Sequence, residues 1–138
     1  MNERVFRRTR QVRQEDTDAL GHVNNVAWVR FVVELADAHS RAVGLDWAAY
    51  QRIGGMWIVR RHEIDYERAA IPSDEISEET WVELARGARS VRRSRFLRSE
   101  GGELLVEATT HWAFVDTKTQ RPKRVHPEVV QRFSAQGA

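Results

Sequence analysis

Asp16-Thr17-Asp18-Ala19-Leu20-Gly21-His22-Val23-Asn24-Asn25 is the stretch that decides the fold, because it joins a polar turn to an amphipathic helix. Beyond it, apolar or small side chains recur with the helical period at Trp28, Val29, Val32, Val33, Leu35, Ala36, His39 and Val43. Asn24 or Asn25 is the expected N-cap, and Gly44 stands where a C′ glycine belongs. We predict one helix of about 18 residues, roughly 27 Å long, with His39 buried on its apolar face.

The composition indicates one folded domain over residues 1–138, because 138 residues, 41% of them hydrophobic, can bury a core. There is no cysteine, and the five histidines show no ligand spacing, so we expect no metal and no cofactor. No apolar run reaches the roughly 18 residues of a membrane span, and Met1 to Val12 lacks the apolar core of a signal peptide. A cytoplasmic protein without a membrane partner is the expectation.

The charge pattern does not favour a nucleic-acid partner. The formal net charge is only +2, although nearly all of the basic residues are arginines. Five acidic residues between Asp74 and Glu83 directly precede the most arginine-rich stretch. We therefore expect no nucleic acid to be bound.

Around the helix, the remaining chain has the alternation and turn signals of β-strands. Met56, Ile58, Ile64 and Tyr66 are expected on one face of a strand, and Gly101-Gly102 is a hairpin turn. The region from Ala69 to Glu79 is predicted as a turn. The predicted strands are Val5–Gln14, Met56–Glu67, Thr80–Gly87, Val91–Ser99 and Glu103–Asp116, with Leu45–Ile53 as a helix or loop and Pro127–Phe133 as a short helix or strand. One long helix across a curved antiparallel sheet is an α+β fold.

Three segments resemble hotdog-fold thioesterases of the 4-hydroxybenzoyl-CoA thioesterase-like branch and, more distantly, plant acyl-carrier-protein thioesterases. The most specific is the Asp16–Asn25 stretch. The others are Asp65–Ala70, similar to the end of the family's second strand, and His111–Thr119, similar to its last strand. The resemblance runs from about residue 9 to residue 133 and implies a hotdog fold, with one central helix wrapped by the sheet.

The resemblance also implies an activity, the hydrolysis of an acyl-CoA thioester to free acid and CoA. Asp18 matches the family's catalytic aspartate, and the backbone N–H of Asn25 matches the amide that polarises the thioester carbonyl. Gly21 matches the glycine that lets the turn approach the substrate, and His22 and Asn24 match polar residues of the acyl-carrier-protein branch. That branch has asparagine where this chain has Leu20. An acyl-carrier-protein thioesterase and a non-catalytic acyl-CoA-binding protein are the alternatives.

The chemistry of thioester hydrolysis suits these residue types. A helix N-terminus presents unpaired N–H groups that stabilise a developing oxyanion. Asp18 can act as general base on water or attack the carbonyl directly, and the sequence leaves both routes open. Glu34, within the helix, is the second choice for the catalytic carboxylate.

Arginines supply the candidate contacts to the phosphates of coenzyme A, because a guanidinium binds phosphate in bidentate fashion. The candidates are Arg86, Arg89 and Arg92, followed by Arg60, Arg61 and Arg68. The same arginine-rich stretch also contains Arg93, Arg95 and Arg98. Strand alternation places Arg92 and Arg98 on one face and Arg93 and Arg95 on the other, so not all of these arginines can bind one ligand. The alternative is that these arginines form only a solvated face of the sheet.

A single helix on one curved sheet leaves open strand edges, which proteins usually protect. The resemblance implies a homodimer or homotetramer with a continuous sheet. Met56–Glu67 is the expected pairing edge, and the active site is expected to lie between subunits.

Overall fold

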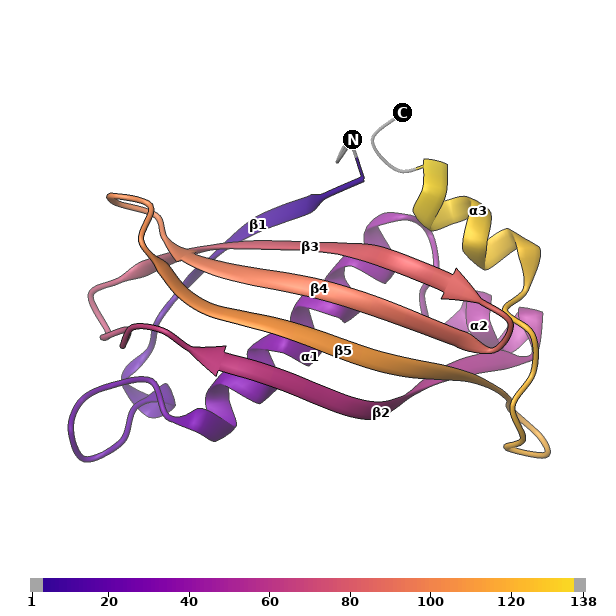
Figure 1. The fold of residues 1–138 in the computed structure, drawn as a ribbon, viewed down its shortest axis with the longest axis horizontal. Coiled ribbons are helices and arrows are strands. Elements are labelled where there is room, and N and C mark those ends of the chain that lie inside the picture. Colours follow the sequence, from indigo (N-terminus) through magenta and orange to yellow (C-terminus); the bar gives the residue numbers. More distant parts are fainter. Residues whose placement is uncertain (1–3, 136–138) are drawn as a thin grey trace.

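A curved sheet wraps one long helix in the computed structural model, which describes residues 4–135 (Figure 1). The long helix is α1 (Asn25–Ala42), and its predicted length and start are confirmed. Two short helices follow, α2 (Trp47–Ile53) and α3 (Pro127–Ala135). The segment predicted as a helix or loop and the segment predicted as a short helix or strand are therefore both helices. The strands are β1 (Phe6–Gln11), β2 (Gly55–Tyr66), β3 (Glu75–Arg86), β4 (Arg89–Arg98) and β5 (Leu104–Asp116).

The five strands form one sheet in the order β1-β3-β4-β5-β2, and every neighbouring pair is antiparallel. The helix α1 crosses the inner face of this sheet, while α2 and α3 lie at one end of it (Figure 1). This confirms the predicted α+β architecture. Both edge strands, β1 and β2, belong to the same sheet, so each has one side without a neighbouring strand among residues 4–135.

The start and end of α1 are set by local chemistry. The side chain of Asn24 accepts a hydrogen bond from the N–H of Ala27 at 2.7 Å, which satisfies one of the unpaired donors of the first turn. At the other end Gly44 has a φ of +86°, the left-handed conformation that ends many helices. Asn24 is therefore the N-cap.

The buried face of α1 forms the centre of the core. Phe31, Val32 and Leu35 are fully buried, and Trp28 packs edge-on against Phe31 and against Phe96 of β4. Each large apolar side chain buried in this way stabilises the fold by about 1.5–3 kcal/mol. His39 is also buried, as predicted.

Two strand boundaries differ from the prediction by more than two residues. β1 ends at Gln11, and a short 3-10 turn (Gln14–Asp16) leads into the loop before α1. β3 begins at Glu75, so the predicted turn over residues 75–79 is wrong and is strand instead. Glu78 contributed to the wrong prediction, because a charged residue at this position is typical of an exposed turn. It is instead fully buried on the inner face beside two arginines of β1.

A β-bulge in β2 changes which residues share a face. The pairing register with β5 shifts between Val59 and Arg61, so Arg60 is the extra residue. Trp57 pairs with Phe114 and Ile64 with Ala108, both on the inner face of β5. The prediction that Met56 and Ile58 share the face of Ile64 and Tyr66 is therefore wrong, since an extra residue moves later side chains to the other face.

Candidate active site

The loop before α1 is a tight, hydrogen-bonded turn. Thr17 and Val23 form an isolated antiparallel bridge, and the N–H of Asp18 donates to the carbonyl of His22 at 2.9 Å. The N–H of Gly21 donates back to the carbonyl of Asp18 at 2.9 Å. Gly21 has a φ of +78°, and a Cβ there would meet nothing within 4 Å, so the glycine is needed for its backbone conformation. The turn therefore holds Asp18 and His22 opposite each other.

The carboxylate of Asp18 is held by one oxygen and exposed to solvent. Its Oδ1 accepts hydrogen bonds from the N–H of Leu20 at 2.9 Å and from the N–H of His22 at 3.3 Å. Within residues 4–135, its other oxygen, Oδ2, has no hydrogen-bond partner. The turn thus orients the carboxylate and leaves one oxygen for a water or a substrate.

The first turn of α1 presents backbone donors beside this loop. The N–H of Asn24 is taken by the carbonyl of Asp16 at 3.0 Å, and the side chain of Asn24 is used as the cap. No partner is found in the described part of the chain for the N–H groups of Asn25 and Val26, and both residues are exposed. Unpaired N–H groups at a helix start favour a negatively charged oxygen.

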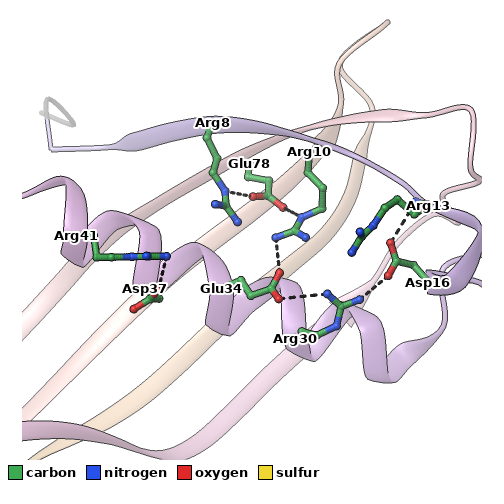
Figure 2. A network of polar contacts seen from close by, with 9 residues as sticks. All are labelled: Arg8, Arg10, Arg13, Asp16, Arg30, Glu34, Asp37, Arg41 and Glu78. Carbon is green, nitrogen blue, oxygen red and sulfur yellow. Dashed lines mark hydrogen bonds and ion pairs between the residues drawn. The ribbon is translucent and has the colours of Figure 1, made fainter. Parts of the chain in front are cut away.

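Asp16 joins the loop to the helix and the sheet. It is only 2% exposed, its Oδ1 accepts from Arg30 of α1, and its Oδ2 accepts from the N–H of Arg13 at 3.2 Å. From Arg30 the contacts continue through Glu34 and Arg10 to Glu78 and Arg8, as Figure 2 shows. This ion-pair network ties the loop that carries Asp18 to both α1 and the edge of the sheet.

Sequence reasoning missed this network because its members are far apart in the chain. Arg8 and Arg10 contact a glutamate of β3 that lies 70 and 68 residues away. Neither arginine belongs to a motif, and each alone reads as a solvated strand residue. The only signal was the alternation of Arg8 and Arg10, which places both on one face of β1.

Glu34, the second choice for the catalytic carboxylate, is occupied within the network. One of its oxygens lies 3.0 Å from Arg10 and the other 3.2 Å from Arg30. Partial burial alone would raise the pKa of Glu34, but the hydrogen bonds and charges of Arg10 and Arg30 outweigh it, so its pKa is lowered. A carboxylate held in this way is a poor base and a poor nucleophile.

The candidate phosphate-binding arginines fall into separate places. Arg86 and Arg89 are direct cross-strand partners on the outer face, and both are exposed. Neither they nor Arg60, at the bulge of β2, form an ion pair within residues 4–135, whereas Arg68 lies 3.6 Å from Glu103. Arg92 is different: it is buried on the inner face of β4 against His39 and Thr80, which does not fit a phosphate site shared with Arg86 and Arg89.

Within one chain the structure does not bring Arg86 and Arg89 to Asp18. The loop before α1 contacts the segment after β2, since the N–H of Val23 donates to the carbonyl of Ala70. The turn between β3 and β4, which carries Arg86 and Arg89, lies at the other end of the sheet beside α2 and α3 (Figure 1). Arg68 is the candidate at the Asp18 end.

Residues 4–135 contain neither a cluster of metal ligands nor a helix that could span a membrane. No group of three or more His, Cys, Asp or Glu side chains in this part could hold a metal ion. None of the helices there combines the length and mean hydropathy that crossing a membrane requires.

A long helix wrapped by an antiparallel five-stranded sheet, with a polar loop feeding the helix start, defines the hotdog fold. Solved structures share it closely. A 1,4-dihydroxy-2-naphthoyl-CoA thioesterase from Synechocystis superposes with a TM-score of 0.87 at 18% identity, over 97% of this chain and 98% of that one. The 12:0-ACP thioesterase from Umbellularia californica superposes with a TM-score of 0.82 at 23% identity, over 95% of this chain and 53% of that one.

The chain belongs to the acyl-ACP thioesterase family, whose N-terminal domain matches residues 3–133. The chloroplastic dodecanoyl-[acyl-carrier-protein] hydrolase of Umbellularia californica is 26% identical over 132 residues, 91% of this chain and 34% of that protein. A palmitoyl-acyl carrier protein thioesterase from Gossypium hirsutum is 30% identical over 103 residues, 70% of this chain and 25% of that protein. The chain thus spans a quarter to a third of the length of these curated relatives. The predicted resemblance to hotdog thioesterases is confirmed.

Proposed function

We propose that this chain hydrolyses acyl thioesters, with Asp18 as the catalytic carboxylate and the N–H at Asn25 as the oxyanion donor. One observation carries the proposal. The turn fixes Asp18 through one carboxylate oxygen and leaves the other open, directly before a helix start whose first N–H groups have no partner within residues 4–135. Membership of a thioesterase family agrees with it.

Two routes fit this arrangement. In the first, Asp18 takes a proton from water as the water attacks the thioester carbonyl, and the tetrahedral intermediate then expels the thiolate. In the second, Asp18 attacks the carbonyl, the thiolate leaves, and water hydrolyses the resulting mixed anhydride. In both, the carbonyl oxygen gains negative charge, which the Asn25 N–H and the positive end of α1 stabilise.

For the thiol carrier we favour coenzyme A, and the alternatives are an acyl carrier protein or binding without turnover. The exposed Arg86, Arg89 and Arg60 have no carboxylate partner within residues 4–135 and suit a polyphosphate ligand. The names of the relatives divide between CoA and acyl-carrier-protein substrates. The test is a hydrolysis screen over aryl-, short-, medium- and long-chain acyl-CoAs, each paired with the same acyl group on an acyl carrier protein. If the protein hydrolyses no acyl-CoA and no acyl-carrier-protein thioester, the proposal is overturned.

Replacing Arg86 or Arg89 by alanine is expected to raise KM for acyl-CoA severalfold and to leave kcat unchanged. The contact to the carrier phosphates is the same in the ground state and the transition state, so only binding is lost. An N-acetylcysteamine thioester has no phosphate, and its KM should stay the same. Arg95→Ala is the matched control, because Arg95 lies on the outer face of β4, the strand of Arg89, but is paired with Glu79 at 3.5 Å. If KM for acyl-CoA in all three variants equals that of the parent protein, Arg86 and Arg89 bind no phosphate and belong to a solvated face of the sheet.

We also propose that two chains pair through β2, which forms an open edge of the sheet. Exposed apolar side chains on that strand, Ile58 and Val59, support this. Pairing would let Asp18 of one chain and the arginine pair of the other serve one substrate, since they lie at opposite ends of a single sheet. Light scattering is expected to show a homodimer or homotetramer at micromolar concentration. Ile58→Lys should weaken this association. Leu84→Lys, on the inner strand β3, should leave it unchanged. A stable monomer would contradict the pairing through β2.

Asp16→Asn is expected to lower kcat roughly tenfold with little change in KM, because small misplacements of a catalytic group reduce rate strongly. Asp16 does not reach the substrate; it positions the loop through Arg30 and the N–H of Arg13. Glu15→Gln is the control, since Glu15 is exposed and its one ion pair within residues 4–135 is with the surface residue Arg13. If kcat falls no further than in the control, the loop does not depend on Asp16.

A further inference from the structure

Among residues 4–135, Arg92 is a buried cation without a carboxylate partner. It is 5% exposed, and no Asp or Glu oxygen lies within ion-pair distance of it in the part of the chain that the structure describes. Its Nη1 donates to Nδ1 of His39 at 2.8 Å and to the hydroxyl of Thr80 at 3.0 Å, and its guanidinium lies 5.4 Å from the ring centre of Phe133. Burial lowers the pKa of Arg92 to about 10, which still leaves it charged at neutral pH.

This arrangement is unusual within the molecule. Among residues 4–135, the buried carboxylates, Asp16 and Glu78, are each paired with arginine. An arginine has five N–H donors, and the two contacts of Nη1 use two of them. Within residues 4–135, Nε and Nη2 have no hydrogen-bond partner. Burying an unpaired charge is costly, so a buried cation with donors to spare suits an anion.

Arg92 lines a pocket of about 180 Å³ between the second half of α1 and the sheet. Most of its wall is apolar or aromatic, from Ala36, Tyr50, Trp57, Val82, Trp112 and Phe133. One carboxylate, Asp37, also lines it, and that carboxylate is paired with Arg41 at 2.8 Å. The indole Nε1 of Trp112 is buried and has no hydrogen-bond partner within residues 4–135, which adds another donor at the same pocket. A cavity of about 150 Å³ holds one benzene-sized molecule, so this one has room for a small ring or a short chain.

We propose that this pocket binds a small organic carboxylate with an apolar body about the size of one aromatic ring, its carboxylate on Arg92 and beside Trp112. The planar guanidinium matches a carboxylate, and the aromatic wall matches the apolar body. Such a carboxylate has two sources: a free acid, or the far end of the acyl group of a thioester that carries a second carboxyl group. Only the second source rests on the proposed function.

Binding is tested on the unmodified protein with benzoate as the probe. Calorimetry and the fluorescence of Trp57 and Trp112 measure the binding. Benzoate is expected to bind roughly 10- to 100-fold more tightly than benzamide, which has the same ring without the charge, because a hydrogen bond to a charged group contributes about 1.5–3 kcal/mol. Acetate, which has the charge without the apolar body, should bind more weakly than benzoate. Equal affinities for benzoate and benzamide, or binding of neither, would overturn the proposal.

Variants assign the affinity to Arg92. Arg92→Met should lose most of the benzoate affinity, and Arg92→Lys should keep part of it. Arg95→Met, on the outer face of the same strand, should bind benzoate like the parent. If Arg92→Met does not fold, the comparison of benzoate with benzamide on the parent protein still decides the proposal.

Kinetics separate the two sources. If the pocket takes the end of the acyl group, benzoate should inhibit hydrolysis competitively, and a thioester with a terminal carboxylate should be preferred over its methyl ester in the parent but not in Arg92→Met. If the pocket takes a free acid, benzoate should leave KM unchanged. A protein that hydrolyses no thioester but binds benzoate through Arg92 would refute the proposed function and support this site.

Discussion

Asp18→Asn is expected to lower turnover of the best thioester at least ~100-fold, the scale of losing a base or nucleophile. The amide oxygen of asparagine can still accept the N–H groups of Leu20 and His22 that hold the turn, so the loop should keep its shape. Asparagine can neither take a proton from water nor form an anhydride. KM should change little, since the ground-state contacts remain.

Two controls accompany the Asp18→Asn assay, and a labelling experiment addresses the chemical route. The thermal unfolding midpoint of Asp18→Asn should match that of the parent, and the exposed Glu15→Gln should keep normal turnover. A single turnover in ¹⁸O-labelled water tests for the nucleophilic route, because label found in Asp18 itself requires the anhydride. Near-normal turnover of Asp18→Asn on every thioester tested would rule out Asp18 as the catalytic group.

The helix and the turn before it could be predicted because their signals are local. The cap at Asn24, the apolar period and Gly44 all lie within the segment that they specify. The same holds for the turn, where Asp18 and Gly21 form hydrogen bonds with near neighbours in the chain. Sequence reasoning therefore located the candidate loop and helix start correctly, although it could not test their chemical role.

The features that sequence reasoning missed depend on distant partners. The face reversal in β2 follows from one extra residue, Arg60, whose position only the pairing with β5 defines. Arg92 belongs to an arginine-rich strand, and its burial follows from its contact with His39, 53 residues away. Alternation alone separated Arg92 from Arg93 correctly, but it could not say which face was covered by α1.

Glu78→Gln is expected to lower the free energy of unfolding by about 3–5 kcal/mol, because removing one partner of a buried ion pair leaves charges uncompensated. Glu78 is 0% exposed, and its two oxygens lie 2.7 Å from Nε of Arg8 and 2.6 Å from Nε of Arg10. The glutamine amide can accept from one arginine, but its NH₂ group would face the other. Urea unfolding at constant protein concentration measures the loss.

The matched control is Glu79→Gln, one residue further along the same strand but on the opposite face. Glu79 also contacts two arginines, Arg7 at 3.2 Å and Arg95 at 3.5 Å, yet Arg7 is largely exposed. Such a surface pair contributes about 0–1 kcal/mol, so this variant should lose little stability and the difference measures burial. Replacing Glu78, Arg8 and Arg10 together by methionine should recover part of the loss, since no buried charge of this group is then left unpaired. If Glu78→Gln is no less stable than Glu79→Gln, the ion pairs of Glu78 do not hold β1 to β3.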